Sequence, residues 1–386
     1  MIKLYNTFEI AVPLWDWIIE KFESRGLTTW AVISKGVYRA KPSNITQHIQ
    51  YVWTIPFLRK YKLISHFTYF LLTPIKILWS RPKVNIFYTQ PPLFYILGAF
   101  CSRLVRIPYV VHVMDFQPEL LAVMGKLRRT GPVYKLLNFL GLRALKKAEE
   151  VIVIGRCMQS LLVRKGVDEK RIQLIHNVST YRPDRVVSTG IKSGIGLEGK
   201  LIILYSGNMG VAHEFETILG VSKRLTRLSS LHFLFVGNGV HRSLIENFIA
   251  DQSPVNVSLI DYLPDDEFQE VSQGSLAHFI SLKSGYEGLM VPSKFYSSIA
   301  AGKPVIYEGG VSSEIALLIA EYGLGKSVLN GDVDEMERCI LSLIEDPSLV
   351  RQISKNCQTA YNDNFRPSII AQNYLQCIDE VIKRRE

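Results

Sequence analysis

The sequence predicts an α/β protein made of two Rossmann-like domains, each built on a parallel sheet. Three observations predict it. Short apolar runs rich in β-branched and aromatic residues alternate with amphipathic segments. The alternation occurs in both halves of the chain, and the polar segment 179–200, which lacks apolar periodicity, separates them. The length of 386 residues suits two domains of moderate size.

In the first half, strands are predicted at 84–88, 109–113 and 150–154, because these runs are dense in valine, isoleucine and aromatic residues. Helices are predicted between them at 93–105 and 132–147. This order is the strand–helix–strand succession of a parallel sheet.

The second half repeats the same succession. A helix is predicted at 214–225, and a last helix, 367–385, follows the complete second unit. The strands predicted for this half are 201–205, 232–236, 257–260, 277–281 and 304–307.

Composition and charge bound the class of protein. Apolar residues make up 47% of the chain, which excludes wholesale disorder. The net charge of +10 is uneven, because residues 1–180 hold 26 basic and 10 acidic side chains while residues 181–386 hold 19 and 25. We therefore expect the first half to face a negatively charged partner.

The cysteines and the apolar segments indicate a compartment. Five cysteines are scattered and never form a C-x-x-C pair, which argues against disulfides and a zinc cluster and for a reducing environment. The first residues lack the layout of a signal peptide, and the apolar run 63–79 is interrupted and short for a membrane span. We expect a cytoplasmic protein, although not one that is free in solution.

Two glycine-containing turns follow predicted strands in the second half. Ser-Gly-Asn-Met-Gly at 206–210 precedes a helix, and Val-Gly-Asn-Gly at 236–239 follows the next strand. Such turns let backbone amides approach an anion, or they are simply tight turns. Neither matches the G-x-G-x-x-G fingerprint of nicotinamide enzymes. The candidate binding residues here are Gly207, Asn208, Gly210, Gly237, Asn238 and Gly239.

The stretch 285–305 has the most informative residue pattern in the sequence. A loop leads into a helix that opens near Pro292 and ends at Gly302 before a strand. Lys294 at the helix start adds a positive charge for a phosphate, and Glu287 can accept hydrogen bonds from sugar hydroxyls. The alternatives are an exposed loop carboxylate for Glu287 and a solvated lysine for Lys294.

This stretch resembles the nucleotide-sugar site of retaining glycosyltransferases of family 4, which have the GT-B fold, and in particular the branch that assembles O-antigen, capsule and colanic acid. The motif Glu-Gly…Val-Pro-Ser-Lys-hydrophobic-Tyr…Ala-Ala-Gly-Lys-Pro-Val matches from Glu287 to Val305. The turns at 206–210 and 236–239 and the segment Asp115-Phe-Gln-Pro-Glu119 are similar to further family motifs. The resemblance covers about residues 84–386 and is strong over 201–310.

The resemblance implies two domains that face each other across a cleft. Residues 1–178 would bind the acceptor and face the membrane, 179–362 would bind the nucleotide sugar, and the helix in 363–386 would return to the first domain. Catalytic roles fall on Glu287, Asp115 and Lys294. Besides the glycine-turn residues above, donor binding falls on His213, Lys283, Gly288, Leu289, Ser293 and Ser297.

Three positions depart from the family pattern. Ser297 stands where a second glutamate usually holds the ribose, and residues 208–215 lack the basic pair that usually neutralises the diphosphate. Met114 replaces a histidine that often precedes Asp115, whereas His112, on the same face of the strand, is either a buried strand histidine or a catalytic group. His213 either reaches the donor or caps a helix, and Asp115 either orients the acceptor or holds the following turn.

No essential cofactor or metal is expected. Asp332 and Asp334 have the spacing of a metal-binding pair, but they open the helix that begins near Glu335 and are better interpreted as a helix cap. The resemblance likewise implies a metal-independent enzyme whose substrate is the nucleotide-sugar donor.

Basic and aromatic residues bracket the apolar run 63–78. This pattern suits a surface that lies among lipid headgroups, with an ordinary amphipathic helix as the alternative. Nucleic acid is not expected, because no helix-turn-helix, zinc or RNA-binding motif is present. The candidate membrane and acceptor residues are Arg59, Lys60, Lys62, Trp79, Arg81 and Lys83.

The function predicted from this resemblance is retaining transfer of a hexosyl or N-acetylamino sugar, from a UDP-linked donor, to a polyprenyl-linked or other lipid acceptor at the inner face of the plasma membrane. Two alternatives stay open. One is a nucleotide-sugar epimerase of the same architecture. The other is a non-catalytic membrane-associated partner that binds nucleotide sugars, which the serine at position 297 keeps open.

Overall fold

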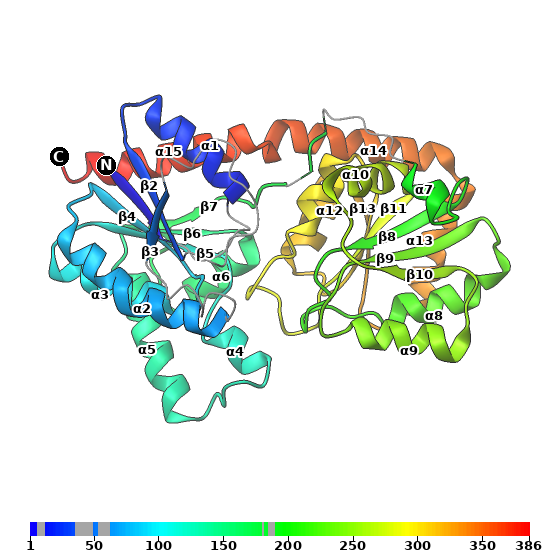
Figure 1. Cartoon of the computed structure of the whole chain (residues 1–386), viewed down its shortest axis with the longest axis horizontal. Coiled ribbons are helices and arrows are strands. Elements are labelled where there is room, and N and C mark those ends of the chain that lie inside the picture. The colour runs from blue at the N-terminus through cyan, green and yellow to red at the C-terminus, as the bar shows by residue number, and fades with distance from the viewer. Residues whose placement is uncertain (6–11, 35–48, 53–61, 180, 184–189) are drawn as a thin grey trace. The chain divides into compact units, whose positions relative to one another are not determined.

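The chain forms two compact units (Figure 1). The computed structural model describes residues 1–5, 12–34, 49–52, 62–179, 181–183 and 190–386. Unit 1 consists of Met1–Val178, Gly288–Val291 and Pro367–Glu386, and unit 2 consists of Ser179–Glu287 and Pro292–Arg366. The short segment Gly288–Val291 therefore belongs with unit 1, although the residues on both sides of it belong to unit 2.

Unit 1 is built on a parallel sheet. Within the described residues its strand order is β3-β2-β1-β4-β5-β6-β7, and every paired strand runs parallel to its neighbour. The strands are β1 (Ile2–Tyr5), β2 (Thr29–Ser34), β3 (Ile49–Val52), β4 (Val84–Tyr88), β5 (Tyr109–Val113), β6 (Glu150–Val153) and β7 (Ile172–Leu174).

Helices cover both faces of this sheet. Figure 1 shows α2, α3 and α5 gathered on one face, with α1 and α15 on the other. The helices of unit 1 are α1 (Val12–Glu23), α2 (Lys62–Trp79), α3 (Phe94–Leu104), α4 (Glu119–Val123), α5 (Pro132–Lys146), α6 (Arg156–Arg164), the 3₁₀ turn η4 (Glu169–Arg171) and α15 (Pro367–Lys383).

The last helix completes the core of unit 1. Tyr374 and Ile378 of α15 are fully buried and pack in one cluster with Phe22 of α1 and Ile86 of β4. Because α15 contributes a whole buried face, the end of the chain stabilises the first unit through apolar burial rather than lying against it as an appendage.

Unit 2 is a second parallel sheet between helices. Its order within the described residues is β10-β9-β8-β11-β12-β13, with strands β8 (Leu201–Ser206), β9 (Leu231–Val236), β10 (Val257–Ile260), β11 (Ala277–Ser281), β12 (Val305–Glu308) and β13 (Gly325–Val328). Its helices are α7 (Ile191–Gly194), α8 (Glu216–Arg224), η5 (Leu225–Arg227), α9 (Arg242–Gln252), α10 (Asp265–Gly274), α11 (Lys294–Ala300), α12 (Glu314–Tyr322), α13 (Val333–Glu345), α14 (Pro347–Ala360) and the π-turn η6 (Tyr361–Phe365).

The predicted fold class is confirmed. Each strand predicted from an apolar run is present to within a residue or so at its ends, and the predicted helix at 132–147 is α5. The prediction missed β1, β2, β3, β7 and β13. The reason is clearest for β13, because Gly325-Lys-Ser-Val is a polar edge strand with no apolar run to reveal it.

Two properties of the chain concern the state of its cysteines and the apolar character of its helices. Each of the five cysteines is a free thiol, and four of them are buried. Among the helices in the described part of the chain, none combines the length and the apolar character that crossing a membrane requires.

His112 of β5 is a buried strand histidine. Its side chain is 1% exposed, and its Nδ1 is hydrogen-bonded to the hydroxyl of Tyr374 on α15. Burial lowers the pKa of His112 to about 3, so the ring is neutral at physiological pH. The catalytic alternative for His112 therefore finds no support in its surroundings, which are those of a core group.

We predict that Tyr374→Phe destabilises the protein by about 1–3 kcal/mol, because the buried Nδ1 of His112 loses its hydrogen-bond partner. Urea-induced unfolding followed by circular dichroism measures the change. The matched control is Tyr262→Phe, since Tyr262 is 57% exposed and its loss of a hydroxyl should cost little. Equal stabilities for the two variants would contradict the prediction.

Candidate functional site

The predicted donor-binding residues of unit 2 gather at one edge of its sheet. The turn 206–210 follows β8, the turn 236–239 follows β9, and Lys283 lies just after β11. These strands are parallel, so their carboxyl ends meet at the same edge. In open α/β sheets this edge is where ligands usually bind.

The two glycine turns pack directly against each other. The amide of Met209 donates to the carbonyl of Asn238 over 2.8 Å. A Cβ atom on Gly237 would lie 2.2 Å from the Gly207 oxygen, and one on Gly239 would lie 2.6 Å from the Met209 oxygen. Gly237 and Gly239 also have φ values of 133° and 146°, which other residues rarely adopt. Only glycine fits at both positions.

Lys294 extends over this pair of turns. Its Nζ donates to the Tyr205 hydroxyl at 2.6 Å, to the Asn208 carbonyl at 2.9 Å and to His213 Nε2 at 3.1 Å. The ammonium lies 4.3 Å from the centre of the Tyr205 ring. Its stem crosses Gly207, where a Cβ atom would lie 2.8 Å from the lysine Cε. Burial lowers the pKa of Lys294 to about 7.

His213 fixes the position of the lysine. Its Nδ1 is 2.7 Å from the carbonyl oxygen of Ser281, so this nitrogen carries the proton and Nε2 accepts from Lys294. Burial, and then the charge of Lys294, lower the pKa of His213 to about 3. Both ring nitrogens are engaged in this way, so His213 does not cap α8, whose N-cap is Phe215.

The remaining predicted residues of unit 2 surround this centre. Glu287 Oε2 accepts from the Gly285 amide at 2.7 Å, and its Oε1 occupies the space that a Cβ on Gly310 would take. Ser293 is exposed at the start of α11. The hydroxyl of Ser297 lies 3.4 Å from the hydroxyl of Ser179.

Gly288 and Leu289 belong to unit 1 instead. The Leu289 carbonyl accepts the Phe116 amide at 2.7 Å, and a Cβ on Gly288 would lie 3.0 Å from the Cys157 oxygen. The segment that follows Glu287 therefore packs beside the turn that carries Asp115.

Asp115 lies at the carboxyl edge of the unit 1 sheet, directly after β5. Its carboxylate accepts from Gln90 Nε2 at 3.2 Å, while its amide donates to Thr89 Oγ1 at 3.1 Å. Burial raises the pKa of Asp115, and the hydrogen bond from Gln90 opposes this. The Thr89 hydroxyl, which also accepts the Met114 amide, is thus the group that holds this turn.

Two further polar side chains of unit 2 were not predicted from the sequence. Tyr205 is one, because an aromatic residue in a buried strand indicates only core. Glu308 at the end of β12 is another. It is fully buried, accepts hydrogen bonds from Thr217 and the Gly331 amide, and has a pKa raised to about 7 by burial. Through these hydrogen bonds Glu308 connects Thr217, at the start of α8, with Gly331, in the turn after β13.

The predicted membrane residues are placed only in part. Trp79 is 87% exposed at the end of α2, Arg81 donates to the Leu78 carbonyl at 2.9 Å, and Lys83 forms an ion pair with Glu386 at 2.8 Å. Lys62 is the first residue of α2. Arg59 and Lys60 lie outside the described residues.

Asp332 is a helix cap, as predicted. Its side chain accepts from the Glu335 amide at 2.9 Å at the start of α13, and Asp334 pairs with Arg224 at 2.5 Å. Within the residues that the structure describes, no group of three or more potential metal ligands is gathered.

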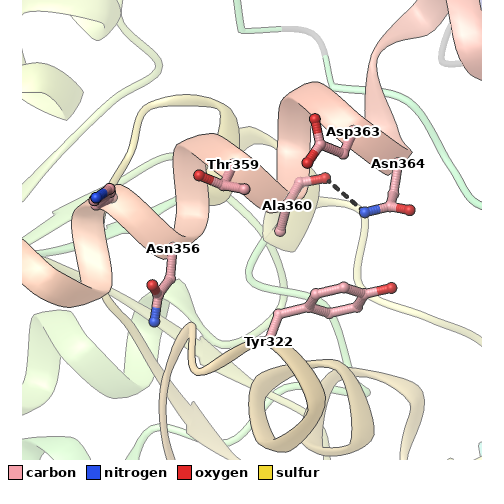
Figure 2. Close-up of a pocket in the computed structure, with 7 residues that line it drawn as sticks. Tyr322, Asn356, Thr359, Ala360, Asp363 and Asn364 are labelled. Atoms are coloured by element: carbon pink, nitrogen blue, oxygen red, sulfur yellow. Dashed lines mark hydrogen bonds between the residues drawn. The ribbon is translucent and has the colours of Figure 1, made fainter.

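Unit 2 also has a hollow of about 230 Å³ among α12, α14 and η6 (Figure 2). None of the predicted site residues lines it. Its lining residues are Tyr322, Lys355, Asn356, Thr359, Ala360, Asp363 and Asn364.

Comparison with known proteins identifies the class. A model of the glycosyl transferase 4-like domain matches residues 45–178. A protein of Pseudomonas aeruginosa named as a glycosyltransferase, WbjE, is 25% identical over 302 residues, covering 77% of this chain and 74% of its own. The chain is thus a glycosyltransferase, and its residues 45–178 are similar to a family 4-like domain. A protein of Escherichia coli K12 named as a colanic acid biosynthesis glycosyl transferase, WcaI, is 23% identical over 236 residues, covering 59% and 58%.

Solved structures show that this glycosyltransferase has the GT-B fold. Anabaena HepE in complex with UDP superposes with a TM-score of 0.73 at 14% identity, over 98% of this chain and 99% of that one. Sucrose-phosphate synthase from Thermosynechococcus elongatus gives a TM-score of 0.75 at 15% identity, over 99% of each chain.

We predict that Gly237→Ala destabilises this glycosyltransferase by at least about 3 kcal/mol, because the methyl group overlaps the Gly207 carbonyl and φ is unfavourable. The control is Gly199→Ala. Gly199 also has a positive φ, but nothing lies within 4 Å of the added atom, so only backbone strain remains. Urea-induced unfolding compares the two, and an equal loss in both would show that the packed turns contribute nothing.

Proposed function

We propose that this glycosyltransferase moves a sugar from a UDP-linked donor to a lipid-linked acceptor, with retention of the anomeric configuration, in the synthesis of a cell-surface polysaccharide. The proposal assigns the donor to the carboxyl edge of the unit 2 sheet. Its donor-binding residues in that unit are Gly207, Asn208, Gly210, His213, Gly237, Asn238, Gly239, Lys283, Ser293 and Ser297.

The observation that carries the proposal is the setting of Lys294. Its ammonium is held by three acceptors that are all uncharged, namely a hydroxyl, a carbonyl and a neutral imidazole. A partly buried cation without an anionic partner is costly, as its lowered pKa reflects. A diphosphate bound beside it supplies the missing negative charge.

The names of similar proteins support the choice of substrates. HepE was solved with UDP and with UDP-glucose, and WcaI is named for colanic acid biosynthesis. These statements concern those proteins, and they favour a nucleotide sugar and a polysaccharide intermediate for this one.

In the proposed reaction, negative charge develops on the departing β-phosphate as the glycosidic bond breaks. Lys294 and the amides of the glycine turns stabilise this charge from fixed positions, which is electrostatic preorganisation. Glu287, held by the Gly285 amide, accepts hydrogen bonds from the sugar. Asp115 has a raised pKa and orients the acceptor hydroxyl.

The acceptor side of the proposal concerns the cytoplasmic face of an anionic membrane. A polyprenyl-linked acceptor is confined to that surface, and Trp79, Arg81 and Lys83, with Arg59, Lys60 and Lys62, would bring the enzyme to it as a peripheral protein.

Incubation with radiolabelled UDP-sugars and a bacterial membrane extract tests the proposal. Transfer of label into the lipid fraction supports it. An isomerised donor without transfer would indicate an epimerase, and binding without either would indicate a non-catalytic partner.

We predict that Glu287→Ala and Lys294→Ala each reduce the transfer rate at least tenfold, since each removes one stabilising contact to the donor. Initial rates of lipid labelling measure the effect. Glu198→Ala, at an exposed position of unit 2, is the control and should keep the full rate. A normal transfer rate in both site variants would show that neither Glu287 nor Lys294 takes part in the reaction.

We also predict that UDP binding at pH 8 takes up close to one proton. Lys294 has a pKa of about 7 in the free protein and is mostly neutral at pH 8. The diphosphate raises that pKa to well above 8, so the amine becomes almost fully protonated on binding. Calorimetry in buffers of different ionisation enthalpy counts the proton. Lys294→Met should abolish the uptake and Lys326→Met should not, whereas uptake that persists without Lys294 would refute its contact with phosphate.

A further inference from the structure

Large apolar side chains are exposed on two neighbouring helices of unit 1. On α3, Phe100 and Leu104 are 65% and 66% exposed. On α5, Leu136 and Phe139 are 58% and 61% exposed. The spacing of three or four residues places each pair on one side of its helix. Both helices therefore present an apolar stripe to solvent.

The neighbouring helix α2 has a stripe of the same kind. Leu71, Ile75 and Trp79 are each more than half exposed and four residues apart. α3 packs against α2 and against α5, and all three cover the same face of the sheet (Figure 1). The stripes thus lie on the outer side of one helical layer. We call this layer the apolar face.

The part of the chain that contains α2, α3 and α5 is rich in exposed cations and poor in acidic residues. Between residues 62 and 147 the sequence holds thirteen lysines and arginines but only Asp115 and Glu119 as acids. Glu119 is 4% exposed and pairs with Lys165, and Asp115 is hydrogen-bonded to Gln90. Lys83 in this interval is paired with Glu386, and the other exposed basic residues are Arg81, Arg103, Arg106, Lys126, Arg128, Arg129, Lys135, Arg143, Lys146 and Lys147.

The combination of exposed apolar side chains and exposed cations favours one kind of partner. A second copy of the chain would bring like charges together, which opposes association. A purely polyanionic partner would use the cations but leave the phenylalanines and leucines in water. An anionic bilayer satisfies both, because lipid phosphates pair with the cations and the headgroup–acyl boundary accepts the apolar side chains.

We propose that α2, α3 and α5 form a membrane-insertion surface, in which Phe100, Leu104, Leu136, Phe139 and Trp79 enter the headgroup–acyl boundary of an anionic bilayer. The inference rests on the proposed function for the identity of the membrane but goes beyond electrostatic attraction. It assigns insertion to the exposed apolar side chains of α3 and α5.

Co-sedimentation of the full chain with vesicles of phosphatidylethanolamine and phosphatidylglycerol tests it. At 0.1 M NaCl we expect binding to these vesicles and little to pure phosphatidylcholine. At 1 M NaCl exposed charges are screened beyond about 3 Å, yet we expect a substantial bound fraction to remain, since apolar insertion is not screened.

The decisive variant is Phe100→Ser with Phe139→Ser. It should bind at least tenfold more weakly and lose the salt-resistant fraction, while the matched control Val255→Ser with Leu329→Ser, at exposed apolar positions of unit 2, should bind like the wild type. Thermal melting followed by circular dichroism verifies that each variant is folded. Brominated lipids should quench Trp79, which is identified by difference from Trp79→Phe.

Three outcomes overturn the inference. These are complete release of the wild-type protein by 1 M NaCl, unchanged binding of the double variant, or light scattering that shows a wild-type dimer which the double variant disrupts. Calorimetric titration with UDP keeps this test separate from the proposed function. Failure of UDP binding with intact insertion rejects the donor proposal alone, and loss of insertion with intact UDP binding rejects only the membrane surface.

Discussion

The contact between two glycine turns is the constraint on which the unit 2 site depends. Gly237 and Gly239 have room for no side chain, because the backbone of residues 207–209 occupies that space. Gly207 likewise has no side chain, and the stem of Lys294 passes through the space that a Cβ atom there would need. Side chains at these glycines would separate the turns and displace the lysine, so backbone geometry at the ends of β8 and β9 determines where the charge lies.

The electrostatics of the site follow from that arrangement. Tyr205, the Asn208 carbonyl and His213 satisfy the three N–H bonds of Lys294 without neutralising its charge. Hydrogen bonds orient the ammonium, but burial still lowers its pKa. These three hydrogen bonds thus orient the ammonium without bringing a negative charge to it, which is why we propose a diphosphate as its ligand.

In unit 1, Glu119 and Glu150 are paired, whereas many basic side chains of the helical layer are exposed. Glu150 is fully buried and pairs with Arg384 at 2.5 Å, near the end of α15, and Glu119 pairs with Lys165. Because these acids face inward or toward the chain terminus, the cations between residues 62 and 147 dominate the outer surface of the helical layer. The packing of α15 therefore has two effects on unit 1. It completes the apolar core, and it brings Arg384 to the position where it pairs with Glu150.

The sequence by itself determined the fold class, the strands that have an apolar run and the position of the two glycine turns, but it missed β1 and β2, which are interior to the unit 1 sheet. Continuous apolar runs such as 201–205 and 233–236 can be recognised in the sequence because strands buried on both faces need them. The polar edge strand β13 lacks such a run. Only the tertiary structure decided that His112 is a core group, that Gly288 and Leu289 pack with unit 1, and that Tyr205 and His213 hold Lys294. It also decided that Phe100 and Phe139 are exposed, whereas other aromatic residues of similar pattern are buried. The reason is physical: hydrophobic periodicity records which side of an element is apolar, but what that side meets depends on contacts between residues far apart in the chain.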